Sequence, residues 1–230
     1  MIRYQDYALL ETTHTPENIE WSISYSFNAR DTETPRVLLI GDSICNAYQS
    51  TVREGLGKYA NVTFWASSKC VTDPDYLREL DYMLDSYWYD AICFNNGLHS
   101  LTASPDEWEE AYANTVRFIS DKCKGIPLFL TLCTPVADRD KNSIVMRINE
   151  SISAFAHKKG LPIIDLYTPM AALNKRENMN DTFHWKAPAV AMQGERICRA
   201  LKPIVAPELV PDLEEEIAVS AEDAKDTVIE

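Results

Sequence analysis

The sequence predicts an α/β protein: a flavodoxin-like, three-layer α/β/α sandwich with a five-stranded parallel sheet, plus an extra N-terminal strand. Five short apolar runs recur along the chain, and a segment with helical periodicity follows each of them. The runs are apolar on consecutive residues, which is typical of strands buried on both faces. Strands and helices that alternate in this way form a parallel sheet with right-handed crossovers, covered by helices on both sides.

The extra strand is the first predicted element and covers residues 19–27, IEWSISYSF. Its apolar and polar residues alternate without exception, which is the pattern of a strand with one buried face. We therefore expect it at an edge of the sheet or over a loop. It belongs to an N-terminal extension, residues 1–35, that precedes the first apolar run.

The main domain is predicted over residues 36–205, because no linker or internal repeat interrupts this stretch. Two of its helices should begin with a capping residue followed by proline, at Asp73-Pro74 and at Ser104-Pro105. The five strands are predicted over 37–41, 62–66, 90–96, 126–133 and 161–166, and the helices over 44–60, 74–88, 105–123, 141–159 and 186–201.

An acidic tail, residues 206–230, is predicted after the last helix, which Pro203, Pro207 and Pro211 should stop. Residues 212–230 hold eight acidic residues and one lysine, so they carry −7 of the formal net charge of −13. A segment with so much charge and so few apolar residues is expected to be flexible.

The overall composition excludes several classes of protein. With a net charge of −13, the protein lacks the excess of basic residues that is typical of proteins that bind nucleic acid or anionic membranes. The sequence has no apolar stretch long enough to span a bilayer, and its first twenty residues lack the core of a signal peptide. The six cysteines show no paired metal spacing, so we expect buried free thiols, a cytoplasmic protein, and no metal or cofactor. No functional role is predicted for His14.

The first buried strand ends in Gly41-Asp42-Ser43-Ile44, at the edge of the sheet where such folds carry their sites. Ser43 should lie in the first turn of the next helix, where free backbone N–H groups and the helix dipole favour a developing oxyanion. A serine here is also a common helix cap, so this motif alone leaves the function open.

A second polar motif, Asp181-Thr182-Phe183-His184, lies after the fifth buried strand and just before the last helix. In a doubly wound sheet this loop returns to the same edge as Ser43. A histidine near a serine can act as a general base, and a nearby aspartate can fix its tautomer. The chain order Ser, Asp, His is compatible with a triad because triads are defined by geometry.

Together, the motif around Ser43 and the Asp181-x-x-His184 motif resemble those of the SGNH hydrolase superfamily, the GDSL-type esterases and lipases. The resemblance covers residues 36–200. It implies a flavodoxin-like fold, a triad with Ser43 as nucleophile, His184 as base and Asp181 as its orienter, and an oxyanion hole with three donors. Those donors would be the Ser43 N–H, an N–H after the second buried strand and a side chain after the third.

The oxyanion hole is where the sequence departs from the family. The usual glycine after the second buried strand is missing, so the N–H would come from Ser68 or Lys69. The family's third block usually reads Gly-x-Asn-Asp. Here His99 takes the usual asparagine position, and we favour it as donor, with Asn95 and Asn96 as substitutes. An asparagine followed by glycine is also common in plain turns, and that interpretation stays open.

We therefore expect a serine esterase that hydrolyses acyl esters through an acyl-enzyme on Ser43. The substrate is expected to be a small acylated molecule, and removal of short acyl (acetyl) groups from a carbohydrate is favoured. This follows from the resemblance, because many members of the superfamily do so. Two alternatives stay open: an acyltransferase that uses the same triad, and a non-catalytic, glycan-binding relative with a degenerate oxyanion hole.

Overall fold

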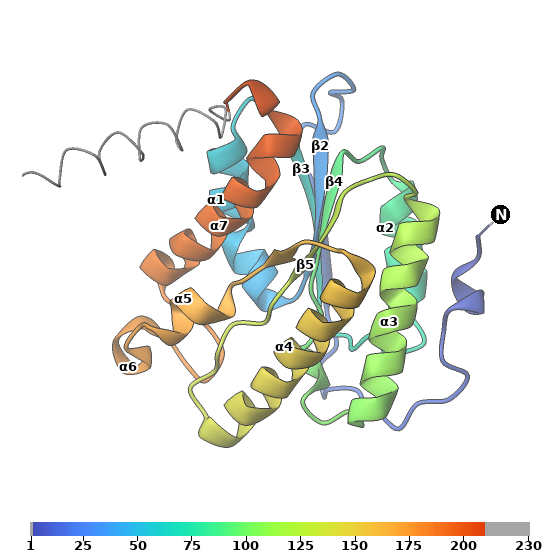
Figure 1. The fold of residues 1–230 in the computed structure, drawn as a ribbon, viewed down its shortest axis with the longest axis vertical. Coiled ribbons are helices and arrows are strands. Elements are labelled where there is room, and N and C mark those ends of the chain that lie inside the picture. Colours follow the sequence, from blue (N-terminus) through green and yellow to red (C-terminus); the bar gives the residue numbers. More distant parts are fainter. Residues whose placement is uncertain (1, 210–230) are drawn as a thin grey trace, which may run out of the picture.

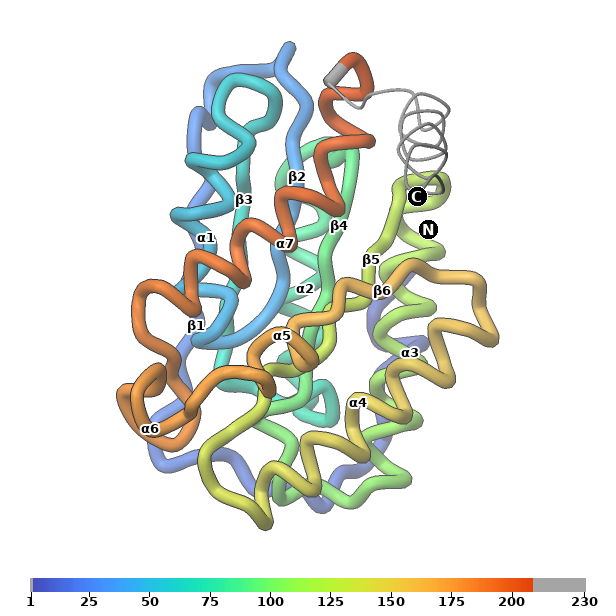
Figure 2. Tube along the Cα trace, turned by 60° about the vertical axis from the view of Figure 1, so that its left-hand side comes forward, coloured from blue at the N-terminus to red at the C-terminus, as the bar shows by residue number. Residues whose placement is uncertain are grey.

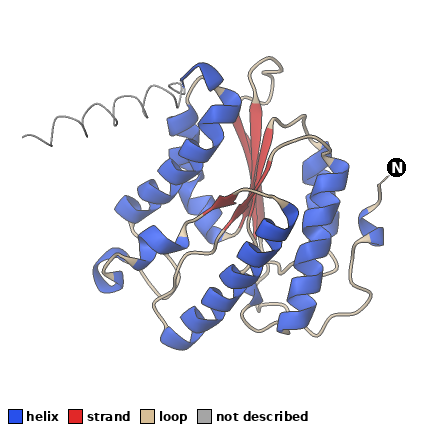
Figure 3. Cartoon of the chain, in the orientation of Figure 1, coloured by secondary structure: helices blue, strands red, loops and turns tan. Residues whose placement is uncertain are grey.

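A single sheet runs through the centre of the molecule, and helices cover both of its faces (Figures 1 and 3). The structure, a computed structural model, describes residues 2–209, so residues 210–230 of the predicted acidic tail, and the expectation that they are flexible, lie outside the described residues. The strands are β1 (Ser22–Ser26), β2 (Arg36–Gly41), β3 (Asn61–Ser67), β4 (Ala91–Phe94), β5 (Leu128–Thr131) and β6 (Ile163–Ile164).

The strands follow the order β1-β3-β2-β4-β5-β6 across the sheet. Strands β2 to β6 are parallel, and β1 runs antiparallel to β3 at the edge. The predicted flavodoxin-like sandwich, with five parallel strands and an extra N-terminal strand, is confirmed. Because parallel strands end at the same edge of a sheet, the loops that follow β2, β3 and β4 meet there.

The helices form the two outer layers of the sandwich (Figures 1 and 2). The long ones are α1 (Ser43–Leu56), α2 (Tyr76–Asp85), α3 (Pro105–Lys122), α4 (Arg139–Lys159) and α7 (Ala187–Val205). Helices α1 and α7 pack together on one face, whereas α2, α3 and α4 cover the other. The short elements are α5 (Tyr167–Ala171), α6 (Lys175–Asn178) and the 3-10 helices η1 (Tyr4–Asp6), η2 (Leu98–Ser100) and η3 (Pro207–Leu209).

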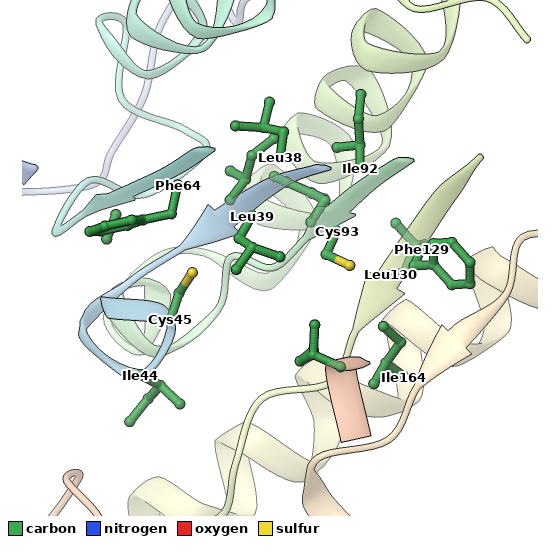
Figure 4. Close-up of a cluster of buried hydrophobic side chains, with 14 of the residues drawn as sticks. Leu38, Leu39, Ile44, Cys45, Phe64, Ile92, Cys93, Phe129, Leu130 and Ile164 are labelled. Carbon is green, nitrogen blue, oxygen red and sulfur yellow. The ribbon is translucent and has the colours of Figure 1, made fainter. Parts of the chain in front are cut away.

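The core lies where the helices meet the sheet. Leu38 and Ile92 point to one face of the sheet, whereas Leu39 and Cys93 point to the other, toward Cys45 of α1 (Figure 4). All five side chains are at most 2% exposed. Because neighbouring residues of a strand point to opposite faces and both faces are covered, the strands appear in the sequence as continuous apolar runs.

Two glycines let α1 and α7 approach each other closely. A Cβ atom on Gly194 of α7 would lie 2.6 Å from Cβ of Thr51 in α1, and one on Gly55 of α1 would lie 2.6 Å from Sγ of Cys198 in α7. Residue numbers rise in the same direction in both pairs, so the two helices run parallel. Both therefore begin at the carboxyl edge of the sheet.

Three local predictions are wrong. Helix α2 begins at Tyr76 instead of Pro74, because the Asp73 carboxylate accepts the Cys70 N–H at 2.7 Å and closes a turn instead of capping a helix. Helix α7 continues through Pro203 to Val205, and a proline so close to the helix end disrupts only its last turn. The N-terminal strand is shorter than predicted, and Ile19 at its expected start is 72% exposed.

Candidate active site

Ser43 is the first residue of α1, directly after the carboxyl end of β2. Asp42 is the N-cap of this helix, and its Oδ1 accepts the Ile44 N–H at 2.8 Å. Gly41 does not have a positive φ. It gives room to α1, because a Cβ atom here would lie 2.7 Å from Cβ of Cys45. The Ser43 N–H has no partner within the helix, because the first N–H groups of an α-helix never do.

His184 lies in the loop between α6 and α7, and its ring joins Ser43 to Asp181. Its Nε2 atom is 2.9 Å from Oγ of Ser43, and its Nδ1 atom is 2.8 Å from Oδ2 of Asp181. A carboxylate accepts hydrogen bonds, so Nδ1 carries the hydrogen and Nε2 is free to accept the serine O–H. The structure thus brings together the three residues predicted for the triad.

Asp181 is held by its own loop as well as by the imidazole. Its Oδ1 atom accepts the N–H groups of Phe183 and His184, each at 2.8 Å. Burial would raise the pKa of this carboxyl, but the hydrogen bonds from His184 and Phe183 outweigh burial and lower the pKa to about 2. Asp181 therefore stays ionised over the whole range in which a histidine can change its charge.

Asn96 lies one residue beyond the point where β4 pairs with β2, the strand that precedes Ser43. The N–H of Asn95 donates to the carbonyl of Ile40 at 3.0 Å, which places Asn96 next to the turn that leads into Ser43. The Asn96 Nδ2 donates to the Lys69 carbonyl at 2.9 Å, and its Oδ1 accepts the Val71 N–H at 3.2 Å. These backbone partners fix the orientation of the amide, which also lies near the buried hydroxyl of Tyr76.

The two residues predicted to supply a backbone N–H after β3 already use those groups. The Ser68 N–H donates to the carbonyl of Trp21 at 3.1 Å, as a continuation of the β1–β3 pairing. The Lys69 N–H donates to the hydroxyl of Ser67 at 3.1 Å. The Lys69 bond is a local contact between residues two positions apart, whereas the Ser68 bond continues the pairing of two strands, so Lys69 is the better placed of the two.

The other side-chain candidates have different partners. His99, in η2, has its Nδ1 atom 2.6 Å from Oε1 of Glu17, and the edge of its ring faces Trp21. Asn95 is 8% exposed, and its Nδ2 donates to the carbonyl of Thr131 at 2.6 Å. Asn95 thus ties β4 to β5 below the surface, and His99 binds the N-terminal extension.

Two contacts of the N-terminal extension with the loop after β3 were not predicted. His14 is 7% exposed and its Nδ1 lies 2.6 Å from Oδ1 of Asp73, in the loop after β3. Glu20 accepts the hydroxyl of Ser68 at 2.5 Å. The contacts join residues 48 and 59 positions apart, so no local spacing could have revealed them.

Within residues 2–209, no three or more His, Cys, Asp or Glu side chains are arranged to hold a metal ion. In the same part of the chain, no helix combines the length and the apolar character needed to cross a membrane.

Comparisons with protein-family models and with curated proteins found no match. Solved structures do match. A GDSL-like lipase from Bacteroides thetaiotaomicron is 17% identical, with a TM-score of 0.58, over 73% of this chain and 87% of the lipase. The acetyl xylan esterase AlAXEase is 16% identical, with a TM-score of 0.61, over 72% of this chain and 99% of the esterase.

A third match is an acetylxylan esterase from Geobacillus stearothermophilus, solved as a catalytic mutant in which a serine is replaced by alanine. It is 13% identical, with a TM-score of 0.59, over 76% of this chain and 97% of the esterase. The resemblance seen in the motifs thus extends to the arrangement of the whole domain. The chain has the fold of the SGNH hydrolases and GDSL-like lipases.

Proposed function

We propose that the protein is a serine esterase that works through an acyl-enzyme on Ser43. The observation that carries this proposal is the continuous set of hydrogen bonds from Ser43 Oγ through the His184 ring to Asp181, with lengths of 2.9 and 2.8 Å. If Ser43 and Asp181 only capped local backbone, they would not need to be joined through the ring of His184. The fold shared with esterases and lipases supports the same conclusion.

In the first half of the reaction, Ser43 Oγ attacks the ester carbonyl carbon while His184 Nε2 takes the serine proton. The bond to the leaving alcohol then breaks, and His184 gives this proton to the alcohol oxygen. In the second half, water attacks the acyl-serine with His184 again as the base, and the acid leaves with Ser43 restored. Asp181 holds the Nδ1 hydrogen and stabilises the imidazolium that forms twice in the cycle.

The oxyanion of each tetrahedral intermediate needs fixed donors. We propose the Ser43 N–H at the start of α1 and the second Nδ2 hydrogen of Asn96. The Lys69 N–H can join them if it releases the Ser67 hydroxyl. The register of β4 against β2 favours Asn96 over His99, because His99 lies three residues farther from the nucleophile strand.

For the substrate we propose a short acyl ester, with acetyl groups on a carbohydrate as the first choice. Support comes from the two acetyl xylan esterases among the structural matches.

The test combines a fluorophosphonate probe with p-nitrophenyl acetate and a panel of acetylated oligosaccharides. We expect the probe to label Ser43, and Ser43→Ala to lose both labelling and turnover. His184→Ala should lose nearly as much activity, because triad residues act as a unit. Absence of labelling in wild-type protein that still turns over esters would contradict the serine mechanism.

Two outcomes of the same experiment would point to the alternatives. If an added acceptor sugar captures the acyl group faster than water does, the protein is an acyltransferase. If the protein binds oligosaccharides but neither labels nor turns over any ester, it is a glycan-binding relative.

A further inference from the structure

Residues 12–21 of the N-terminal extension lie along the carboxyl edge of the sheet. In Figure 1 the chain between η1 and β1 runs down past α3 to the edge of the molecule at which α3 begins. Thr13 fastens it there, because both its N–H and its hydroxyl donate to Oε2 of Glu107, at 3.1 and 2.7 Å. Glu107 belongs to the first turn of α3.

The next residue, His14, turns inward and reaches the loop that follows β3. Its side chain is 2% exposed, and that of its partner Asp73 is 10% exposed. One carboxylate oxygen of Asp73 contacts His14 Nδ1 at 2.6 Å, while the other accepts the Cys70 N–H at 2.7 Å. The imidazole thus holds the carboxylate that closes the turn at Cys70.

Farther along, Glu20 and Trp21 hold the start of the same loop. The Ser68 hydroxyl donates to Glu20 Oε2 at 2.5 Å and accepts the Trp21 N–H at 2.8 Å. Burial alone would raise the pKa of Glu20, but hydrogen bonds from Ser68 and from the Glu17 N–H lower it overall. The Glu20 carboxylate is therefore a stable acceptor for the Ser68 hydroxyl at neutral pH.

Between these two attachments, the loop is bonded to Asn96. The Asn96 amide spans the Lys69 carbonyl and the Val71 N–H, one residue on either side of Cys70. Any shift of the turn at Cys70 must therefore move the Asn96 amide. A buried imidazole and carboxylate cost more desolvation energy than two apolar side chains of the same size. Packing alone therefore does not explain why His14 and Asp73 occupy these positions.

We propose that His14 is a positioning residue for the oxyanion hole, acting through Asp73 and the turn at Cys70 on the Asn96 amide. The inference rests on the proposed function, in which Asn96 donates to the oxyanion. Such donors are effective only when they are fixed before the charge develops. The N-terminal extension then completes the active site without contacting the substrate.

The experiment uses four variants of the full chain. His14→Leu removes the donor to Asp73 and keeps an apolar side chain, and His14→Asn can present an amide N–H near the position of Nδ1. Thr13→Ala is the matched control, because it loses a bond to α3 and leaves the loop untouched. Glu20→Ala loosens the same loop from a partly exposed position, so it keeps the test valid if His14→Leu fails to fold.

We measure kcat and KM for p-nitrophenyl acetate, the melting temperature, and the number of active sites titrated with the fluorophosphonate. In His14→Leu, kcat per titrated site should fall about tenfold or more with KM within about twofold, as expected when only the transition state loses an interaction. Glu20→Ala should lower kcat severalfold, His14→Asn should recover most of the loss, and Thr13→Ala should match the wild type.

A residue that only stabilised the fold would lower the melting temperature and the number of titrated sites and leave kcat per site unchanged. That result in His14→Leu, or unchanged kcat in Glu20→Ala if His14→Leu does not fold, overturns the positioning role while the esterase proposal stands. Wild-type protein that neither labels at Ser43 nor turns over esters would overturn the proposed function, and this inference with it.

Discussion

Asn96 binds two backbone groups of the loop after β3 through its side-chain amide, and its second Nδ2 hydrogen is the donor proposed for the oxyanion. Its removal should therefore affect the transition state more than substrate binding. We predict that Asn96→Ala lowers kcat about a hundredfold or more, equivalent to roughly 3 kcal/mol, with little change in KM. Steady-state kinetics with a short-chain ester will measure this.

His99→Ala serves as the comparison. The imidazole of His99 is bonded to Glu17 in the N-terminal extension, so its loss should reduce kcat much less than the loss of the Asn96 amide. The reverse order, with a crippled His99→Ala and an active Asn96→Ala, would return the donor role to His99.

Asp181 should not contribute to the acid side of the pH profile above about pH 4. Its pKa, about 2, lies below the ordinary value of 3.8, because hydrogen bonds to the carboxylate outweigh burial. The ionised form is thus favoured by the folded state, and its contribution to stability is present above about pH 4 and lost as the pH falls toward 2. Asp181 should therefore keep its negative charge between pH 4 and 8.

We therefore predict that protonation of Asp181 adds nothing to the slope of the acid limb of log kcat/KM above about pH 4. Stopped assays over this range, with circular dichroism to verify that the protein stays folded, will measure it. A slope of two would mean that a second group, such as Asp181, gains a proton in the same range.

Helices α1 and α7 determine the distance between the proposed nucleophile and base, because Ser43 begins α1 and His184 lies three residues before α7. In an isolated helix, Gly194→Ala would stabilise by about 1 kcal/mol. Here the new methyl group would lie 2.6 Å from Thr51 and 3.2 Å from the carbonyl of Tyr48, so the helices must separate.

We predict that Gly194→Ala destabilises the protein by about 1–3 kcal/mol and lowers kcat, since separation of the helices lengthens the bond between Ser43 and His184. Denaturant unfolding and kinetics will measure the two effects. Glu195→Ala, an exposed neighbour on the same helix, is the control and should change neither. A Gly194→Ala protein more stable than the wild type would show that the helix contact is looser than the distances indicate.

The elements of the fold were predictable because burial on both faces leaves a continuous apolar run, as in β2, and because periodicity marks the long helices. Ser43, Asp181 and His184 were predictable as candidates because the strand order sends their loops to one edge. The roles of Asp73 and Ser68 were not predictable. Both depend on partners in the N-terminal extension, and local sequence carries no record of such distant contacts.

Five of the six cysteine side chains are buried in the folded protein. All six cysteines are free, and Cys123 is the only one that is not buried. Burial raises the pKa of Cys45 and Cys133 to about 12 and that of Cys70 to about 11, so these thiols are not thiolates at neutral pH.

We predict that the native protein at pH 8 reacts with about one equivalent of a thiol-disulfide reagent, at Cys123, whereas the unfolded protein reacts with all six cysteines. Iodoacetamide should leave ester turnover unchanged. Inactivation by iodoacetamide that parallels modification of a single cysteine would mean that a thiol takes part in the chemistry.

The contact between α1 and α7 also has a consequence for folding during synthesis. Ser43 and His184 are 141 residues apart. Helix α7, which packs against α1, is the last long helix within residues 2–209. A chain synthesised only as far as Asn180 would contain Ser43 and all six strands of residues 2–209, but neither His184 nor helix α7. Domains fold as units once the chain has emerged. In a growing polypeptide, Ser43 would therefore lack its histidine partner until α7 packs against α1. The proposed nucleophile and the proposed base should therefore meet only after α7 has been synthesised.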